Sequence, residues 1–350
     1  MFPKIYGKKN SIVLEYKDKI ILADPTVDVE RRPDIILISH AHSDHISKLS
    51  SVYRPGSKVI MSPATYKILR MQGFSFRGDD IVLVSPGDEV EIGSLRFRIR
   101  NAGHVIGSIM FEIDFGKIVV GFTGDFNFEG TNVLPPADIM DVDILVLDAT
   151  YGKPIFSFPP REIMYRIIRE KLKILLEEDD ERELSLHGYA LGKGQELTRL
   201  TWELLGIPAC VDRNVAMYNK IYEDTMRKPL GNYTIGTKSK IYIRSLRSRK
   251  VGKNVKRILF TGWVALSGTS SKVLGFPLSS HNGFTKLVDY VIRVSPDFVY
   301  VAYGYKEDFS KFLIKEMGIP AKPIPESPEE LKLRIRIVRG VKNMTMDAFS

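Results

Sequence analysis

The 350-residue sequence contains a single cysteine, Cys210, so an intramolecular disulfide is excluded. Any metal site would therefore depend on histidine and carboxylate ligands. No stretch comes near the roughly 20 consecutive apolar residues that a membrane helix needs, and residues 1–17 lack the long apolar centre of a secretory signal. We expect an intracellular protein with no membrane partner, cytoplasmic in a prokaryote and nuclear in a eukaryote.

Acidic residues are also missing from a long segment, residues 225–288, although the whole chain has 42 of them. The charged residues of this segment are thirteen cations, Arg227, Lys228, Lys238, Lys240, Arg244, Arg247, Arg249, Lys250, Lys253, Lys256, Arg257, Lys272 and Lys286. A solvated basic face is the ordinary explanation of a charge run. Thirteen cations without a single acidic residue favour a polyanion-binding surface, because such a segment attracts phosphate groups and its binding to them releases counterions.

Short runs of β-prone residues dominate the first part of the chain. They predict strands within residues 11–17, 19–25, 34–40, 58–63, 80–88, 91–100, 108–116, 117–125 and 142–152, and residues 63–73 have helical spacing. This pattern predicts a layered α/β domain rich in strands.

The pattern changes after a proline-rich stretch at residues 154–160. Residues 161–178 predict an amphipathic helix, and residues 183–206 predict a strand, a glycine-rich loop and a helix. Further strands are expected within residues 240–248 and 257–263. A helix, strand, helix alternation then follows within residues 283–318.

The segment ISHAHSDHI, residues 38–46, carries three of the six histidines and an aspartate at the end of an apolar strand. His40 and His42 can point the same way from an extended backbone, and after the turn Asp44 and His45 can face a neighbouring point. Clustered polar rings cost free energy unless something binds them. The spacing predicts a metal site, and it suits two adjacent cations better than one.

Other candidates lie at the ends of later strands or in loops. His104 in NAGHVIGS is flanked by glycines, Asp125 ends VVGFTGD, Asp148 ends VLVLD, and His281 precedes a helix. Each alone would more often be structural, but together with the first cluster they favour metal binding. An aspartate can give one oxygen to each of two metals. His187 in LSLHGYA lacks such a context, and we expect it to be structural.

The motifs HAHSDH, AGH and TGD, in this order, resemble the metallo-β-lactamase fold. The later LDATYG and SSH resemble the added motifs of its β-CASP branch, which processes nucleic acids. The resemblance implies an α/β protein, a four-layer αββα sandwich with an inserted β-CASP cap. It places the first part of the metallo-β-lactamase domain at residues 1–158, the cap at residues 159–272, and the C-terminal return of the first domain at residues 273–350.

Within that branch, several details resemble the DNA-processing group that includes Artemis and the cross-link repair exonucleases. VLDATYG, with Asp148, is similar to that group's Leu-Asp-Thr-Thr-Tyr, and FTGW at residues 260–263 is similar to its Thr-Gly-Trp. ALGKGQEL is similar to its Ile-Gly-Lys segment, although GQEL also resembles RNA-processing members. Tyr303 fits neither group, because the RNA-processing members usually have histidine there and the DNA group valine.

The resemblance implies a role for each candidate residue. One metal would be held by His40, His42 and His104, and the second by Asp44, His45 and His281, with Asp125 bridging. The acids that orient ligands by hydrogen bonding would be Asp24 and Asp148. The catalytic carboxylates would be Asp44, Asp125 and Asp148. A pocket for a terminal 5'-phosphate would contain Thr150, Lys193 and Ser279. The histidine-rich set favours zinc, and the carboxylates would also accept manganese or iron.

We therefore expect a metal-dependent phosphodiesterase with two divalent ions, which would activate a bridging water and neutralise charge on the phosphate. The main expectation is a 5'-to-3' DNA exonuclease that prefers a 5'-phosphate and acts in DNA repair or processing, with DNA favoured over RNA. The first alternative is a β-CASP ribonuclease, for which GQEL is the best argument. Two further alternatives are less favoured. A hydrolase of small thioesters or lactams would need no cap, and a non-catalytic nucleic-acid-binding scaffold would not need the complete set of metal ligands.

Overall fold

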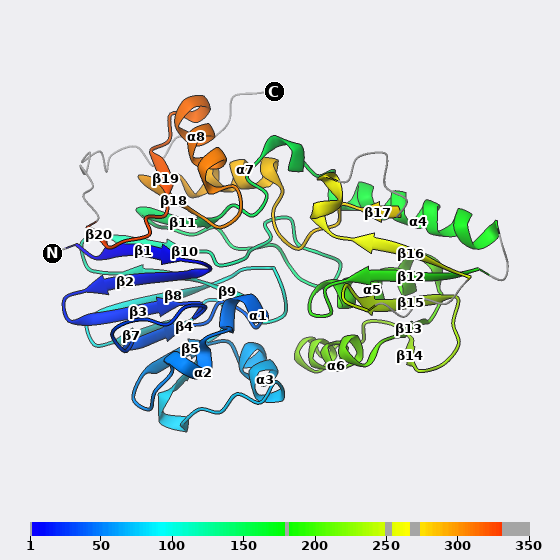
Figure 1. Ribbon diagram of the computed structural model, residues 1–350, viewed down its shortest axis with the longest axis horizontal. Coiled ribbons are helices and arrows are strands. Elements are labelled where there is room, and N and C mark those ends of the chain that lie inside the picture. Colours follow the sequence, from blue (N-terminus) through cyan, green and yellow to red (C-terminus); the bar gives the residue numbers. More distant parts are fainter. Residues whose placement is uncertain (1, 179–181, 249–253, 267–273, 331–350) are drawn as a thin grey trace.

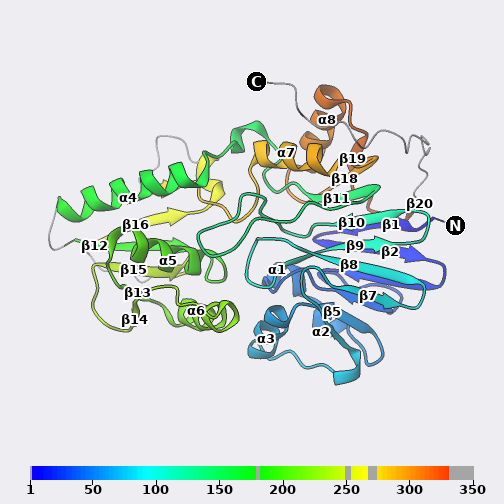
Figure 2. The ribbon, with the colours of Figure 1, turned by 180° about the vertical axis from the view of Figure 1, so that it is seen from behind.

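The computed structural model describes residues 2–178, 182–248, 254–266 and 274–330. Two seven-stranded sheets lie face to face in one part of the molecule, and a six-stranded sheet forms the other part (Figure 1). The view from behind in Figure 2 shows the same division. We call the first part the body and the second part the cap. Within the described ranges, no helix combines the length and apolar character that a membrane span requires.

The first sheet of the body has the strand order β20-β1-β2-β3-β4-β5-β6. Its strands are β1 (Lys4–Lys8), β2 (Ser11–Tyr16), β3 (Lys19–Ala23), β4 (Ile35–Leu37), β5 (Lys58–Met61), β6 (Ile81–Leu83) and β20 (Glu329–Glu330). Three helices follow strands of this sheet, α1 (Ser43–Ile46), α2 (Leu49–Val52) and α3 (Pro63–Met71), and η1 (Gly78–Asp80) precedes β6. Their apolar side chains pack on one face of the sheet.

The second sheet has the order β19-β18-β11-β10-β9-β8-β7. Its strands are β7 (Glu89–Ile92), β8 (Leu95–Asn101), β9 (Ile109–Asp114), β10 (Val119–Phe122), β11 (Ile144–Asp148), β18 (Phe298–Ala302) and β19 (Ala321–Pro323). Helices α7 (Phe284–Val294) and α8 (Lys306–Met317) share a core with its outer face, and an apolar core that includes Phe97 and Phe111 fills the space between the two sheets. The body is therefore a four-layer αββα sandwich, as the sequence predicts.

The stretch at residues 91–100, predicted as one strand, is divided between two. Gly93 has a φ of +64°, and the chain reverses so that Ile92 pairs with Leu95 across β7 and β8. Glycine accepts this left-handed conformation without the steric cost that a side chain would bring. Apolar and polar residues alternate on both sides of this turn, so the sequence pattern does not show where β7 ends and β8 begins.

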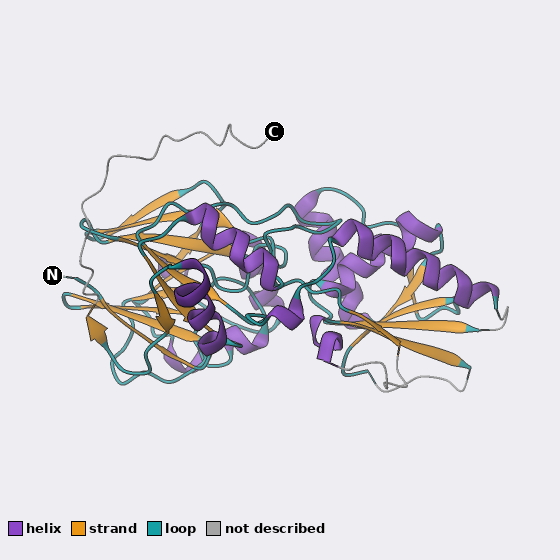
Figure 3. Ribbon diagram, turned by 90° about the horizontal axis from the view of Figure 1, so that it is seen from above, coloured by secondary structure: helices purple, strands orange, loops and turns teal. Residues whose placement is uncertain are grey.

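The cap sheet has the order β14-β13-β15-β12-β16-β17, and all of its strand pairs are parallel. Its strands are β12 (Glu183–Gly188), β13 (Ala209–Val211), β14 (Tyr233–Ile235), β15 (Ile241–Ser245), β16 (Val255–Phe260) and β17 (Leu274–Phe276). Its helices are α4 (Arg161–Glu177), α5 (Lys193–Leu205) and α6 (Arg213–Met226), and η2 (Pro154–Phe156) and η3 (Gly262–Leu266) lie near the body. Figure 3 shows the cap beside the body, with the long helix α4 along it.

The cap has its own apolar core, built from its sheet and helices. Helix α6 has no counterpart among the expected elements, and it begins where the Asp212 carboxylate accepts a hydrogen bond from the backbone N–H of Val215. The domain boundaries at residues 158/159 and 272/273 stay predictions, and the second falls outside the described residues.

Candidate metal centre

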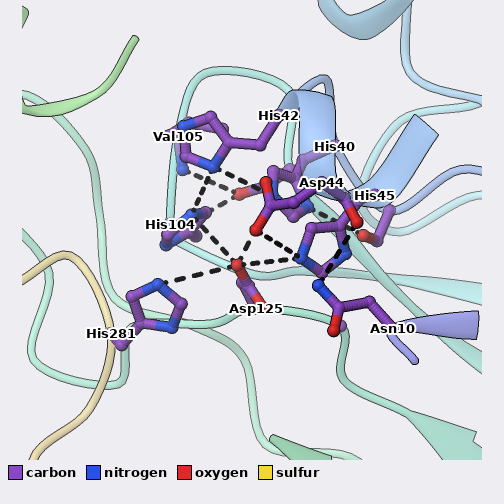
Figure 4. Close-up of polar contacts among 12 residues, drawn as sticks. Asn10, His40, His42, Asp44, His45, His104, Val105, Asp125 and His281 are labelled. Carbon is purple, nitrogen blue, oxygen red and sulfur yellow. Dashed lines mark hydrogen bonds and ion pairs between the residues drawn. The ribbon is translucent and has the colours of Figure 1, made fainter. Parts of the chain in front are cut away.

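The candidate side chains come from loops and from one short helix at the ends of body strands. His40 and His42 follow β4, and α1 carries Asp44 and His45. His104 follows β8, Asp125 follows β10, and His281 lies between β17 and α7. Figure 4 shows these side chains pointing toward one another, with Asp125 among them. We call them the metal centre, with the members His40, His42, Asp44, His45, His104, Asp125 and His281.

One carboxylate oxygen, Asp125 Oδ2, lies near four imidazole rings. It is 3.2 Å from His45 Nε2, 3.5 Å from His40 Nε2, 3.6 Å from His104 Nε2 and 3.6 Å from His281 Nε2. The Asp125 side chain is only 6% exposed. A single buried carboxylate is therefore the common neighbour of rings from three separate segments.

The other two members of the metal centre are His42 and Asp44. His42 Nδ1 lies 3.1 Å from both His40 Nε2 and His104 Nε2. Asp44 Oδ2 lies 4.0 Å from His45 Nε2, and the Asp44 side chain is 68% exposed. Asp44 is thus the solvent-facing acid of an otherwise enclosed group.

Each histidine of the metal centre has an oxygen partner at its other ring nitrogen. These pairs are His40 Nδ1 with Ser39 Oγ at 2.8 Å, His42 Nε2 with Leu191 O at 3.2 Å, His45 Nδ1 with Asp24 Oδ2 at 2.8 Å, His104 Nδ1 with Ser280 O at 2.8 Å, and His281 Nδ1 with Asp148 Oδ2 at 3.0 Å. Carbonyl and carboxylate oxygens only accept, so the outward nitrogen donates the N–H there. In a neutral ring the inward nitrogen then keeps a free lone pair.

This arrangement fits a metal ion. Imidazole nitrogens and a carboxylate oxygen from separate segments converge at short distances, which is the kind of donor set that a divalent cation binds. Three overlapping groups could hold one, namely His40 with His42, His104 and Asp125, then Asp24 with His40 and His45, and finally Asp125 with Asp148 and His281. Nitrogen-rich sets with carboxylate oxygen suit zinc. The outward hydrogen bonds are those that orient metal-binding histidines.

The pKa values of the histidines differ strongly within the metal centre. Burial lowers the pKa of His40 and of His104 well below the usual range. Burial opposes a charge on His45 as well, but the Asp125 and Asp24 carboxylates raise its pKa well above the usual value. For His281, Asp125 and Asp148 likewise outweigh burial and raise the pKa to about 9. His40 and His104 are therefore neutral near pH 7, the form in which imidazole binds a metal.

Two acids hold the rings in place from behind. Asp24 is fully buried and accepts hydrogen bonds from Ser39 N at 2.8 Å, Ser39 Oγ at 2.6 Å and His45 Nδ1 at 2.8 Å. Asp148 accepts from His281 with one oxygen and from the Thr150 N–H and hydroxyl with the other. Both acids have the ligand-orienting contacts that the resemblance implies.

Two of the three residues proposed for a 5'-phosphate have partners within the chain. The Thr150 hydroxyl is bonded to Asp148, and Lys193 is buried with its ammonium on the Glu196 carboxylate. Ser279 lines a cavity that neither of the other two lines. Burial lowers the pKa of Lys193 to about 8 although Glu196 opposes this shift. The geometry therefore gives Lys193 an internal partner, and its phosphate role stays a prediction.

Tyr303 lies beside the metal centre. Its ring centroid is 5.9 Å from that of His45, and its hydroxyl donates to Asn10 O at 2.9 Å. Asn10 Nδ2 in turn donates to the backbone carbonyl of Asp44 at 3.2 Å. Sequence reasoning missed Asn10, because an ordinary turn residue far from the motif gives no signal. Tyr303 has a φ of +62°, a strained conformation for a bulky residue.

A second buried polar cluster joins cap and body, and we call it the junction network, with the members Arg161, Tyr165, Lys193 and Glu196. The Glu196 carboxylate is in contact with the Arg161 guanidinium, the Lys193 ammonium and the Tyr165 hydroxyl. Arg161 Nη2 also donates to the carbonyl of Ser279, two residues before His281. Sequence reasoning missed this role of Arg161. The only signal was GQEL, whose Glu196 supplies the anion.

The chain is similar to known proteins along most of its length. A family model described as "Beta-lactamase superfamily domain" matches residues 19–170. RNase aCSPSF2 of Saccharolobus solfataricus is 27% identical over 262 residues, 67% of this chain and 50% of that protein. A probable DNA ligase of Opitutus terrae is 25% identical over 312 residues, 85% of this chain and 29% of that protein.

An RNase J-like protein of Methanocaldococcus jannaschii is 28% identical over 190 residues, 49% of this chain and 44% of that protein. The chain thus spans half or less of the length of these curated relatives. Among solved structures, a protein of unknown function from Enterococcus faecalis V583 has a TM-score of 0.64 at 13% identity, covering 95% of this chain and 99% of that one. That likeness concerns the fold alone.

The fold-class prediction is confirmed: the chain has the metallo-β-lactamase fold, an αββα sandwich with an inserted β-CASP cap. The relatives support the β-CASP family but not its Artemis branch. The prediction of a DNA exonuclease is wrong, because the matching nucleases are named as RNases. The predicted preference for DNA and the predicted role in DNA repair are therefore not supported. The relatives favour the ribonuclease alternative.

Proposed function

We propose that the protein is a metal-dependent ribonuclease of the β-CASP type, which hydrolyses RNA phosphodiesters at the metal centre. The observation that carries the proposal is the position of Asp125 Oδ2 within 3.6 Å of four imidazole nitrogens. The similarity to RNase aCSPSF2 and to an RNase J-like protein supports RNA as the substrate.

The donor set suits two divalent cations, with zinc as the proposed metal. One would be held by His40, His42 and His104, the second by Asp44, His45 and His281, and both by Asp125. Bound divalent ions supply a water nucleophile at neutral pH and stabilise charge on the phosphate. The protein's own part is to hold the five rings in place, because each ring makes a hydrogen bond to an oxygen on its outer side.

Charge on the cap supports a polyanionic substrate. Nine cations of the acid-free segment lie in the described part of the chain, Arg227, Lys228, Lys238, Lys240, Arg244, Arg247, Lys256, Arg257 and Lys286. They lie directly after α6, on the cap strands, in the turns between the strands, and on α7. Contacts of this kind bind a nucleic acid through its backbone and make binding weaker as salt rises.

The test compares RNA and DNA of one sequence, both end-labelled, with protein that has been depleted of metal and then reloaded with zinc. We expect RNA to be cleaved faster and only by the reloaded protein. Labels at either end and a circular RNA separate cleavage from an end and cleavage within the strand. Equal or faster loss of the DNA would contradict the proposal, and so would cleavage by protein that metal analysis finds empty.

A further inference from the structure

One aromatic side chain of the cap is exposed to solvent beside the metal centre. Tyr189 is 52% exposed, whereas the other tyrosines of the chain are buried or half-buried. The centroid of its ring lies 6.3 Å from that of His42, and the two ring planes are tilted by 44°. The two rings are therefore not stacked on each other, and the exposed part of the Tyr189 ring is open to a ligand.

Tyr189 stands at the carboxyl edge of the cap sheet. It directly follows β12, and Arg247 lies two residues after the end of the neighbouring strand β15. These two strands pair in parallel and run toward the body (Figure 1). Open parallel sheets bind their ligands outside the carboxyl ends of the strands. The topology therefore puts an exposed aromatic ring and a cation at the edge where a ligand is expected.

The backbone that carries this ring is held to both parts of the molecule. The carbonyl of Tyr189 accepts a hydrogen bond from the N–H of Gly194 in α5 at 2.9 Å. Two residues after Tyr189, the carbonyl of Leu191 lies 3.2 Å from Nε2 of His42 in the body. The ring thus projects from a fixed backbone, so little conformational entropy is lost when a ligand contacts it.

Charges of both signs act on the ring. Burial raises the pKa of Tyr189, the carboxylates of Asp44 and Asp125 raise it further, and the Arg247 guanidinium opposes them. The ring is therefore within electrostatic reach of the metal centre and of a cap cation. Both acids are proposed metal ligands, whose charge bound cations would offset. Arg247 is exposed, and its charge attracts a phosphate.

These features match one part of an RNA strand, the base. Every base has a flat π face that stacks on an aromatic ring, and proteins that bind single strands combine such rings with cations along the backbone. The cleaved phosphodiester has to lie at the metal centre, and an adjoining base is attached to a sugar that this phosphodiester links. A ring that receives such a base should stand beside the metal centre, exposed and near a cation, as Tyr189 does.

We propose that Tyr189 stacks on the base of a nucleotide that adjoins the cleaved phosphodiester, on the side of the metal centre where His42 lies. The proposal rests on the proposed ribonuclease function and adds a substrate-binding residue to it. Because stacking needs only a π face, this contact holds the strand in place without reading its sequence.

The experiment uses RNA substrates in which a single abasic nucleotide is placed in turn at each position around the cleavage site. With the native protein, we expect cleavage at limiting RNA to fall roughly tenfold at one position next to the cleaved bond, the order of effect found for a stacked base. Tyr189→Ala should cleave the intact RNA roughly tenfold more slowly and lose the dependence on that position. Tyr189→Phe keeps the ring and should behave like the native protein.

The matched control is Ile235→Ala, which also removes a large exposed side chain from the cap. Ile235 is 54% exposed and is the last residue of β14, the outer strand of the same sheet. This variant should keep the native pattern. A native pattern without a sensitive position next to the cleaved bond would overturn the proposal, as would a Tyr189→Ala variant that keeps the full position effect.

Binding separates this inference from the proposed function. Metal-depleted protein is titrated with the intact RNA and with a fully abasic strand of the same length, and fluorescence anisotropy reports the affinity. A preference for the intact RNA that Tyr189→Ala loses and Tyr189→Phe keeps supports the stacking site even if no RNA is cleaved. Normal cleavage of the intact RNA together with an equal preference in Tyr189→Ala would leave the ribonuclease standing and refute the stacking site.

Discussion

The polar groups of the two buried clusters, the junction network and the metal centre, find their partners in different ways. In the junction network, Glu196 is in contact with both Arg161 and Lys193, so each charge has an opposite charge within the chain. In the metal centre, the inward atoms of the histidines face each other and the carboxylates of Asp125 and Asp44. Buried polar groups without good partners are costly. The junction network therefore pairs its charges within the chain, whereas the metal centre is proposed to need a cation.

The largest expected effect comes from the shared carboxylate of the metal centre. Asp125→Asn keeps the shape of the side chain but removes the charge that would serve both cations. We expect RNA cleavage to fall by more than the ~1,000-fold that loss of one electrostatic contact can cost. Cleavage rates and metal content by mass spectrometry measure this, and a variant that keeps its full metal content would contradict the bridging role.

The junction network should respond in stability rather than in metal content. Glu196→Gln leaves Arg161 and Lys193 buried without their anion, and we expect the free energy of unfolding to fall by roughly 3–5 kcal/mol. Denaturant titration measures it. The control is Glu203→Gln, which removes the partner of Arg199 at a partly exposed pair and should cost under about 1 kcal/mol. Similar losses for both would refute the distinction.

Metal itself should stabilise one cluster and leave the other unchanged. Zinc at 100 times its Kd would raise the free energy of unfolding by about 2.7 kcal/mol if it binds only the folded chain. We expect Glu196→Gln to keep this increment and Asp125→Asn to lose most of it. Thermal unfolding with and without zinc provides the measurement, and an equal increment in Asp125→Asn would count against the metal centre.

The smallest effect concerns His187, a histidine of neither cluster. Burial lowers its pKa to about 4 from 6.5, so the unfolded chain binds more protons between these values. The stability that this group contributes is complete above pH 6.5 and is lost as the pH falls toward 4. Between pH 6.5 and 5.5, we expect the free energy of unfolding of His187→Gln to fall by about 1 kcal/mol less than that of the native protein. Denaturant titration at each pH measures this. If the free energies of unfolding of the two proteins changed with pH in parallel, His187 would not titrate in this range.

The sequence could predict which side chains meet in the metal centre, because several of them share one short motif, but their role as metal ligands stays a prediction. HAHSDH places several donors in one short segment, and His104 and Asp125 follow strands of a body whose loops meet at one edge. The junction network could not be predicted in this way. Arg161, Tyr165 and Glu196 look like ordinary helix residues, and their meeting depends on how α4 and α5 pack at the body.

The substrate prediction failed for a physical reason as well. It depended on sequence identities such as Asp148, but in the structure this acid accepts hydrogen bonds from His281 and Thr150. GQEL, which favours RNA-processing members, consists of packed residues here. Gln195 Oε1 accepts from Gly192 N at 2.7 Å, and Glu196 belongs to the junction network. A motif can be typical of one group of proteins because its residues pack together. Such a motif says little about substrate specificity.

One hydrogen bond described above links the two parts of the molecule. His42, a residue of the body, is bonded through Nε2 to the carbonyl of Leu191 in the cap. A displacement of the cap that breaks this bond would free the ring to turn or to change tautomer, so the affinity of the proposed metal centre for a cation would depend on the position of the cap. By reciprocity, a cation bound there would help to keep the cap docked.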